Sequence, residues 1–333
     1  MTSFPELPED DYAVVYMEDT DRLLPEKINP STRYAFFKTI ARGGKSVIQV
    51  CKDLHLCRYI CYKHLRAELQ DDPVEQRRFL REARVSAMLQ HPNTIPTYEV
   101  GRDSKGHYYF TMKFVHGHTL REIQDDPKKR DLEHMINVLV EIAQALDYAH
   151  HHRVIHRDIK SENILVGPFG EVLLLDWGLA KVWNEDGSSI TLGDHDPENV
   201  ADDDDDDDIP VSSFTCAGKP LGTVAYMSPE QIDNSPDIDY RTDIYSLGAV
   251  LYEALTGRTP FIAETVNEMC EEILHGTVPE PHSLPGIKAP PALADVAMQC
   301  IQRKPEERMQ SCKDVIDILQ SDWHGGGHSV PWV

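Results

Sequence analysis

The sequence predicts an α+β protein in which a small sheet with one helix precedes a larger, mainly helical region. Between residues 34 and 115, β-branched and aromatic residues fill short runs that are separated by turn-forming Gly and Asp. From residue 131 onwards, apolar residues recur at helical spacing instead. Residues 1–33 are rich in Pro, Glu and Asp and show no sustained period, which indicates a mostly irregular, acidic extension.

Composition bounds the class of protein. Hydrophobic residues make up 41% of the 333 residues, enough for a large buried core. The net charge of −23 argues against nucleic acid and anionic membranes as partners. No apolar run approaches the roughly 18 residues of a membrane span, and the N-terminus lacks a signal-peptide pattern. The seven cysteines are scattered without a C-x-x-C pair, which favours reduced thiols. We therefore expect a cytoplasmic protein with no membrane anchor of its own.

Three strands are expected first, from the runs YAFFKTIAR, SVIQVCK and CRYICYKHL. The first two are joined by Gly43-Gly44. A Gly-bearing turn can let backbone N–H groups approach a phosphate, because Gly has no side chain in the way. Taken alone, this turn is better explained as an ordinary hairpin turn than as a nucleotide loop.

One helix follows. Asp72 is a suitable N-cap, Pro73 suits the first helical position, and an apolar stripe of Phe79, Leu80, Ala83, Ala87 and Met88 is expected on the helix. Lys63 ends an apolar strand before it, and Glu82 lies on the helix itself. Each of the two could be an ordinary surface charge, but their joint placement favours an ion pair. Two further strands, TIPTYEV and HYYFTMKFV, complete this region.

The second region begins with a helix over residues 131–150 that ends in a His triplet. Adjacent histidines on a helix point in different directions, so a solvated helix end is favoured over a metal site. Next comes HRDIKSEN at residues 156–163, then a short hairpin that ends at Asp176-Trp177-Gly178. A helix from Arg241 is apolar almost all round and is therefore expected to be buried. The last helix is expected near residues 311–322.

The pattern H-R-D-x-K-x-x-N followed by D-W-G resembles the eukaryotic-type serine/threonine protein kinases. The resemblance covers residues 34–322, and the segments FLREARVSAMLQHPN, DWGLAK and AYMSPEQ are most similar to bacterial members. It implies a bilobal fold, with an N-terminal sheet lobe over residues 34–115 and a helical lobe over residues 116–322. A Gly-rich tail then occupies residues 323–333.

The resemblance also implies roles in phosphoryl transfer from ATP with Mg²⁺. Asp158 would orient the acceptor hydroxyl and take its proton, and Lys160 would neutralise the γ-phosphate. Asn163 and Asp176 would hold Mg²⁺. Arg157 would contact a phosphate on the activation segment, which runs from Asp176 to Glu230.

On the nucleotide side, the family's three loop glycines correspond to Ala41, Gly43 and Ser46, so only one glycine of the pattern remains. The nucleotide-contacting residues implied by the resemblance come from the loop, the ion pair, the gatekeeper and the hinge: Ala41, Gly43, Gly44, Ser46, Ile48, Lys63, Glu82, Met112, Lys113 and Val115. Met112 would be the gatekeeper, and Lys113 to Val115 the hinge.

The segment from Asp176 to Glu230 is long for this family and contains an acidic insert at residues 184–210 with twelve acids and no Lys or Arg. A run such as Asp202–Asp208 repels itself, so a solvated loop is the simplest interpretation. The alternatives are that the insert binds basic partners or substrates, or mimics phosphate towards Arg157.

The end of the segment favours Ser or Thr as the acceptor, because Thr223 matches the threonine of serine/threonine kinases. Ser212, Ser213 and Thr215 lie where related kinases carry activating phosphorylation, and Thr215 is the first choice. Two further matches are structural. Asp243 would hold the backbone of the catalytic loop, residues 156–163, and Arg308 would pair with Glu230.

The function predicted is a protein kinase that phosphorylates Ser/Thr hydroxyls of protein substrates. A pseudokinase that binds nucleotide or serves as a scaffold is the alternative that the reduced glycine loop favours. A small-molecule phosphotransferase of the same fold is a third, opposed by the peptide-docking segment Gly222–Glu230.

Overall fold

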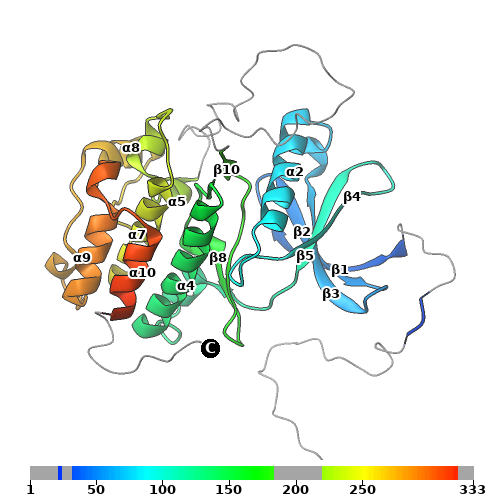
Figure 1. Ribbon diagram of the computed structural model, residues 1–333, viewed down its shortest axis with the longest axis horizontal. Coiled ribbons are helices and arrows are strands. Elements are labelled where there is room, and N and C mark those ends of the chain that lie inside the picture. The colour runs from blue at the N-terminus through cyan, green and yellow to red at the C-terminus, as the bar shows by residue number, and fades with distance from the viewer. Residues whose placement is uncertain (1–21, 25–31, 184–219, 322–333) are drawn as a thin grey trace, which may run out of the picture. The chain divides into compact units, whose positions relative to one another are not determined.

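The computed structural model describes residues 22–24, 32–183 and 220–321 (Figure 1). They form two compact units. The first, here the sheet unit, contains the described residues up to Gln90 together with Thr94–Gly117 and Gly167–Glu171. The second, here the helical unit, contains His91–Asn93, His118–Val166 and the described residues from Val172 onwards. Each unit is described by itself.

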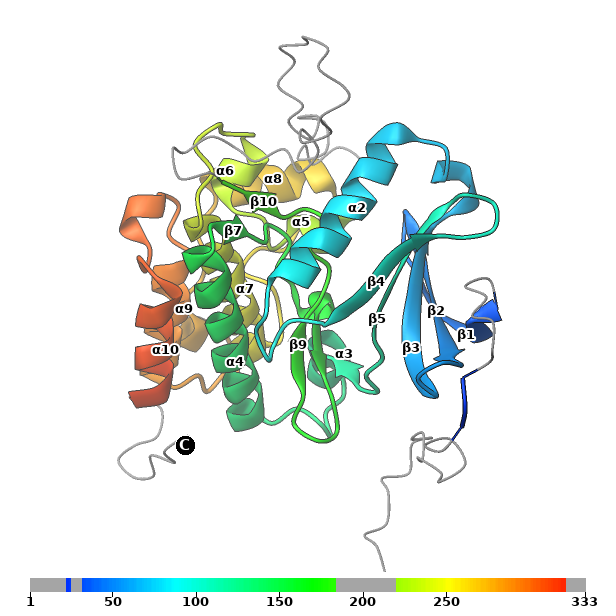
Figure 2. The ribbon, with the colours of Figure 1, turned by 45° about the vertical axis from the view of Figure 1, so that its right-hand side comes forward.

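The sheet unit is built on a five-stranded antiparallel sheet in the order β1-β2-β3-β5-β4. Its strands are β1 (Tyr34–Arg42), β2 (Ser46–Asp53), β3 (Arg58–Leu65), β4 (Thr97–Arg102) and β5 (Tyr108–Lys113). The short 3-10 helix η2 (Ala67–Leu69) and helix α2 (Pro73–Met88) connect β3 to β4. Figure 2 shows α2 lying along the sheet beside β4 and β5. The predicted sheet with one long helix is confirmed.

Helix α2 begins where the sequence predicts. The Asp72 side chain accepts hydrogen bonds from the backbone N–H groups of Val74 at 2.8 Å and Glu75 at 3.2 Å. These bonds satisfy donors that have no partner inside the helix.

The buried face of α2 differs from the predicted stripe. Ala87 and Met88 are exposed, whereas Glu82, Val85 and Ser86 are buried. Positions 79, 82, 83 and 86 follow helical spacing, so the face is regular but contains a charged residue and a serine. The predicted stripe is confirmed for Phe79 and Ala83 and wrong for Ala87 and Met88, because the prediction counted only apolar residues.

The helical unit contains most of the helices. They are α3 (Leu120–Asp125), α4 (Leu132–His151), α5 (Leu221–Val224), α6 (Pro229–Ile232), α7 (Arg241–Thr256), α8 (Val266–His275), α9 (Pro291–Cys300) and α10 (Cys312–Ser321). Helix α7 packs against α4 and α9, and α10 packs against α4 (Figure 1). Every residue of α7 from Thr242 to Thr256 is buried, as expected for a helix that is apolar almost all round.

Short elements complete the helical unit. One small sheet has the order β6 (His118–Thr119), β8 (Ile164–Val166), β9 (Val172–Leu174), and a second pairs β7 (Val154–Ile155) with β10 (Lys181–Val182). The 3-10 helices are η3 (Ser161–Asn163), η5 (Pro281–Ser283) and η6 (Pro305–Glu307). The predicted α+β class is therefore confirmed.

Among the described residues, no helix combines the length and the apolar character that a membrane span requires. The described cysteines are all free thiols. Burial raises the pKa of Cys51 and of Cys61 to about 12, so these thiols stay protonated at neutral pH.

The helical unit contains the predicted ion pair between Arg308 and Glu230. Arg308 Nη1 and Nη2 donate to the two carboxylate oxygens of Glu230 at 2.7 and 2.6 Å. The Arg308 side chain is fully buried and also donates to the backbone carbonyl groups of Arg241, Gln302 and Arg303. This fork fixes the start of α6 to the segment before α10.

We predict that Arg308→Ala lowers the free energy of unfolding by about 3–5 kcal/mol, because it leaves a largely buried carboxylate without its partner. The exposed pair Lys313–Asp317 on α10 is the matched control, and Lys313→Ala should cost less than about 1 kcal/mol. Urea unfolding of the two variants measures both values. Equal losses of unfolding free energy in the two variants would show that the buried pair stabilises the fold no more than the exposed pair does.

Candidate active site

In the sheet unit, Lys63 and Glu82 form a buried ion pair. Lys63 lies on β3 and Glu82 on α2, with Nζ 2.5 Å from Oε1, and the two residues are 6% and 9% exposed. Each of these two charges, largely removed from water, compensates the charge of the other. The pair therefore holds the Lys63 ammonium group in place on β3.

The turn that contains Gly43 and Gly44 joins β1 to β2. The Gly43 N–H donates to the Ser46 carbonyl oxygen at 2.9 Å. A Cβ atom added at Gly43 would meet Ser46 O at an ordinary 3.7 Å, and one at Gly44 would meet nothing within 4 Å. The hairpin itself thus does not require glycine. The missing side chains leave room for a ligand to approach, and the Gly43 N–H is already bonded within the hairpin.

The other nucleotide-side residues lie on the strands of the same sheet. Ala41 on β1 pairs with Ile48 on β2, and Ile48 pairs in turn with Lys63. Met112 is buried on β5 between Cys61 and Thr97, and Lys113 ends that strand with its N–H bonded to the Pro96 carbonyl oxygen at 2.9 Å. Val115 follows two residues later and is half-buried.

In the helical unit, a carboxylate on α7 holds the backbone of the catalytic loop. Asp243 accepts from the N–H groups of His156 at 2.9 Å and Arg157 at 2.8 Å. It also accepts from the His150 ring, at 2.9 Å from Nε2. Arg157 has a φ of 66°, a left-handed conformation that non-glycine residues seldom adopt, and these bonds stabilise it.

The prediction of a solvated His triplet is wrong for His150. Its side chain is only 8% exposed and contacts Asp243, whereas His151 and His152 are exposed and bond to backbone carbonyl groups of their own helix. The difference arises because α4 packs on α7, where Asp243 needs a donor.

Asp158 and Lys160 form the centre of the site. Lys160 Nζ lies 2.8 Å from Asp158 Oδ2 and 3.3 Å from Thr223 Oγ1. Asn163 Nδ2 donates to the Asp158 carbonyl oxygen at 2.8 Å and to Oδ2 at 3.1 Å. The loop thus brings a carboxylate, an ammonium, an amide and the Thr223 hydroxyl to one place.

Burial raises the pKa of Asp158, the charge of Lys160 opposes this rise, and Asp176 adds to it. A carboxylate whose pKa is raised is a better proton acceptor than an ordinary one, provided that it remains ionised. Lys160 contacts the carboxylate directly, which favours its ionised form.

His156 packs beneath the loop and does not face the cluster. Its Nε2 bonds to the Leu175 carbonyl oxygen at 3.0 Å, and its Nδ1 accepts from the Asp158 N–H at 3.2 Å. A carbonyl only accepts and an N–H only donates, so both nitrogens are committed. The fully buried Trp177 sets its ring edge-on to His156, with centroids 4.5 Å apart.

Asn163 and Asp176 supply the type of oxygen that Mg²⁺ prefers. The Leu175 N–H donates to the Asn163 carbonyl oxygen at 2.8 Å, which ties the two segments together. The amide nitrogen of Asn163 points to Asp158, so its Oδ1 is not the atom that bonds to Asp158. Asp176 has a φ of 62°, a second left-handed residue in the same site. The donor set fits a hard divalent cation.

The described end of the activation segment is anchored to the catalytic loop. Thr223 lies on α5, and Gln231 on α6 donates from Nε2 to the Arg157 carbonyl oxygen at 2.8 Å. Arg157 Nε donates to the Leu179 carbonyl oxygen at 2.8 Å. The acidic insert with Ser212, Ser213 and Thr215 lies outside the described residues.

Sequence reasoning missed a second buried carboxylate. Glu253 on α7 is 1% exposed and accepts from Ser161 Oγ at 2.5 Å and from the Tyr226 hydroxyl at 2.8 Å. Arg121 of α3 pairs with it at 2.6 Å. Burial and Glu253 raise the pKa of Tyr226, so its hydroxyl remains a donor. The network joins the catalytic loop to the peptide-docking segment.

The comparison with family models identifies this arrangement. A model of the protein kinase domain matches residues 34–324. The chain belongs to the protein kinase family.

Curated relatives add the class of kinase. The chain is 34% identical to the serine/threonine-protein kinase PknD of Protochlamydia amoebophila over 88% of its own length and 30% of that protein. It is 33% identical to a probable serine/threonine-protein kinase of Clostridium acetobutylicum, over 87% of this chain and 40% of the relative. It is 31% identical to PknD of Chlamydia felis, over 90% of this chain and 32% of the relative.

The chain thus spans well under half of the length of these relatives. They are bacterial and are named as serine/threonine kinases, as the sequence motifs predicted. Their names give no support to the pseudokinase alternative.

We predict that Glu253→Gln lowers the free energy of unfolding by about 1–3 kcal/mol, because Arg121 loses a largely buried charged partner. It should also speed hydrogen exchange at the amides of η3. The matched control is Glu162→Gln, which removes a more exposed carboxylate 3.3 Å from the same arginine and should cost under about 1 kcal/mol. Unchanged exchange in η3 would contradict a link between Glu253 and the loop.

Proposed function

We propose that this chain is the catalytic domain of a serine/threonine protein kinase that transfers the γ-phosphoryl group of ATP to Ser or Thr hydroxyls of proteins. One observation carries the proposal: Asp158, Lys160 and Thr223 meet in the helical unit at hydrogen-bonding distances. Phosphoryl transfer needs a placed hydroxyl and compensated charge rather than covalent help from the protein. This cluster offers both.

Asp158 orients the acceptor hydroxyl and takes its proton as the new O–P bond forms. The bond from the γ-phosphorus to the β,γ-bridging oxygen breaks, and ADP leaves with that electron pair. Lys160 places a positive charge beside Asp158, where negative charge on the transferred group is compensated. Thr223 accepts from Lys160 and so keeps the ammonium in position.

The residues of the sheet unit would contact the nucleotide itself. Lys63, held by Glu82, would contact the α- and β-phosphates, and the backbones of Gly43 and Gly44 would approach them. The hinge at Lys113 to Val115 would hold the adenine. Asn163 and Asp176 would hold Mg²⁺, which neutralises phosphate charge when bound.

The proposal also covers regulation by phosphorylation and the binding of protein substrates. Arg157 would meet a phosphate on Ser212, Ser213 or Thr215, and protein substrates would dock near Gly222–Glu230. Binding of basic partners by the acidic insert, a role in signal transduction and a cytoplasmic location rest on the sequence alone.

We predict that the unmodified chain transfers labelled phosphate from ATP to itself or to a generic basic protein in the presence of Mg²⁺. Asp158→Asn should slow transfer by about 10²–10⁴-fold, because it removes the proton acceptor. The exposed Asp237→Asn is the matched control and should keep the full rate.

Stabilisation by ATP, followed by thermal unfolding, separates binding from chemistry. Asp158→Asn should keep this stabilisation, because Asp158 acts on the acceptor. A chain that is stabilised by ATP but transfers no phosphate would overturn the proposed activity.

A further inference from the structure

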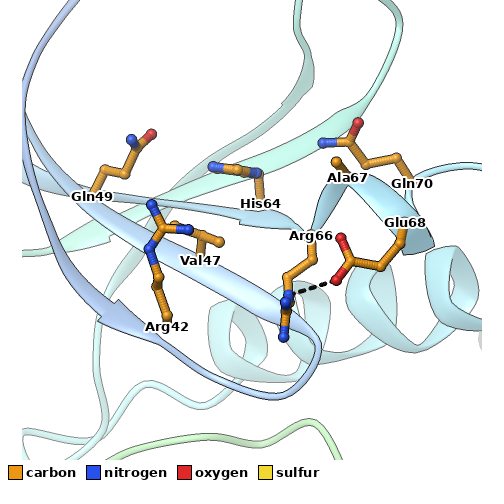
Figure 3. A pocket seen from close by; sticks show the side chains of 8 residues that line it. All are labelled: Arg42, Val47, Gln49, His64, Arg66, Ala67, Glu68 and Gln70. Carbon is orange, nitrogen blue, oxygen red and sulfur yellow. Dashed lines mark ion pairs between the residues drawn. The ribbon is translucent and has the colours of Figure 1, made fainter.

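A pocket of about 250 Å³ lies in the sheet unit, away from the Lys63–Glu82 pair (Figure 3). A cross-strand row forms its base: Arg42 on β1 pairs with Val47 on β2, which pairs with His64 on β3. Successive side chains of a strand point to opposite faces of a sheet. Since Lys63 and His64 are neighbours on β3, the pocket opens on the face opposite to the ion pair.

The pocket is lined by hydrogen-bond donors and by two guanidinium groups. Gln49 lies two residues along β2 from Val47, and Arg66 and Glu68 form the wall that follows β3. Figure 3 shows the ion pair between Arg66 and Glu68, at 2.9 Å, on this wall. Arg66 also reaches the Gly44 carbonyl oxygen at 3.4 Å.

Arg42 differs from Arg66. Within the described part of the chain, its guanidinium makes no hydrogen bond and no ion pair, and the Gln49 amide likewise has no partner there. His64 bonds through Nδ1 to the Leu65 carbonyl oxygen at 2.8 Å, which leaves Nε2 for another group. Three donor side chains from three adjacent strands are therefore available on one concave surface.

A guanidinium fork matches the oxygens of phosphate, and a pair of such forks suits a doubly charged anion. The small volume suits one phosphate group on a short side chain. Extended polyanions are disfavoured, because a chain with a net charge of −23 repels a nucleic acid or an anionic membrane over the wider surface. We propose that this pocket, through Arg42, Gln49, His64 and Arg66, binds a phosphomonoester carried on a protein side chain.

This site goes beyond the proposed kinase activity and uses none of its residues. Phosphate binding there requires neither ATP nor transfer. The test therefore measures binding alone, and its outcome is independent of whether the chain proves to be an active kinase.

The probes are a short, neutral-sequence peptide with a central phosphoserine, the same peptide with serine, and inorganic phosphate. Titration calorimetry gives each dissociation constant, and the arginine Nε–Hε resonances report which guanidinium groups respond. We expect the phosphopeptide to bind and to shift the Nε–Hε resonance of Arg42. The serine peptide should show no binding, and inorganic phosphate should bind more weakly than the phosphopeptide.

Variants give effects of opposite sign. Arg42→Gln should raise the dissociation constant about tenfold or more, the usual weight of a hydrogen bond to a charged group. Glu68→Gln should lower it about two- to fivefold, because it removes a competing carboxylate from the rim. Lys38→Gln, which removes one exposed positive charge from the same strand outside the pocket, is the matched control and should change it less than about twofold.

Equal effects of Arg42→Gln and Lys38→Gln would overturn the proposal, since they would reveal only a general attraction by charge. Equal binding of the serine peptide would do the same. Inorganic phosphate that binds as tightly as the phosphopeptide would overturn the assignment to a protein side chain. A nucleic acid or an anionic vesicle that displaces the phosphopeptide through Arg42 would also contradict it.

Discussion

The catalytic loop of this chain depends on one buried carboxylate. Asp243 receives two consecutive backbone N–H groups, and so holds Arg157 in a left-handed conformation that costs about 1–3 kcal/mol for a residue with a side chain. Burial alone would raise the pKa of Asp243, but the hydrogen bond and charge of His150 outweigh it, and the pKa lies below its usual value. The stability that Asp243 contributes is therefore present at neutral pH and is lost as the pH falls through this lowered pKa.

The other parts of the helical half of the site follow from that anchor. With the backbone at residues 156 and 157 fixed, the Asp158 N–H reaches His156 Nδ1, and Asp158 meets Lys160 and Asn163. Helix α7 provides a second anchor nearly three turns later, where Glu253 holds Ser161 and Tyr226. One helix that is buried along its whole length thus positions both ends of the loop, because a rigid element transmits position more faithfully than a loop does.

Residue identity and spacing sufficed for much of the fold and for the chemical centre. The five strands of the sheet, the N-cap of α2, the buried α7 and the motif residues could be predicted, because each signal is local in sequence. The buried polar face of α2 could not, since Glu82 pairs there with Lys63, which comes from another element. The same holds for His150 and Glu253, whose partners are 93 and 92 residues away. The pocket at Arg42 depends on the register of three strands, which no single run of residues specifies.

The central claim is that Asp243 holds the catalytic loop in its working geometry. Amide hydrogen exchange in Asp243→Asn, followed beside phosphate transfer from ATP, tests it directly. An asparagine keeps the shape but loses the charge and one acceptor, so exchange at His156 and Arg157 should rise at least about tenfold, the cost of roughly one charged hydrogen bond. Transfer should fall in parallel, while β2, β3 and β5 stay protected. Full transfer with an unprotected loop, or unchanged protection at both amides, would contradict the account.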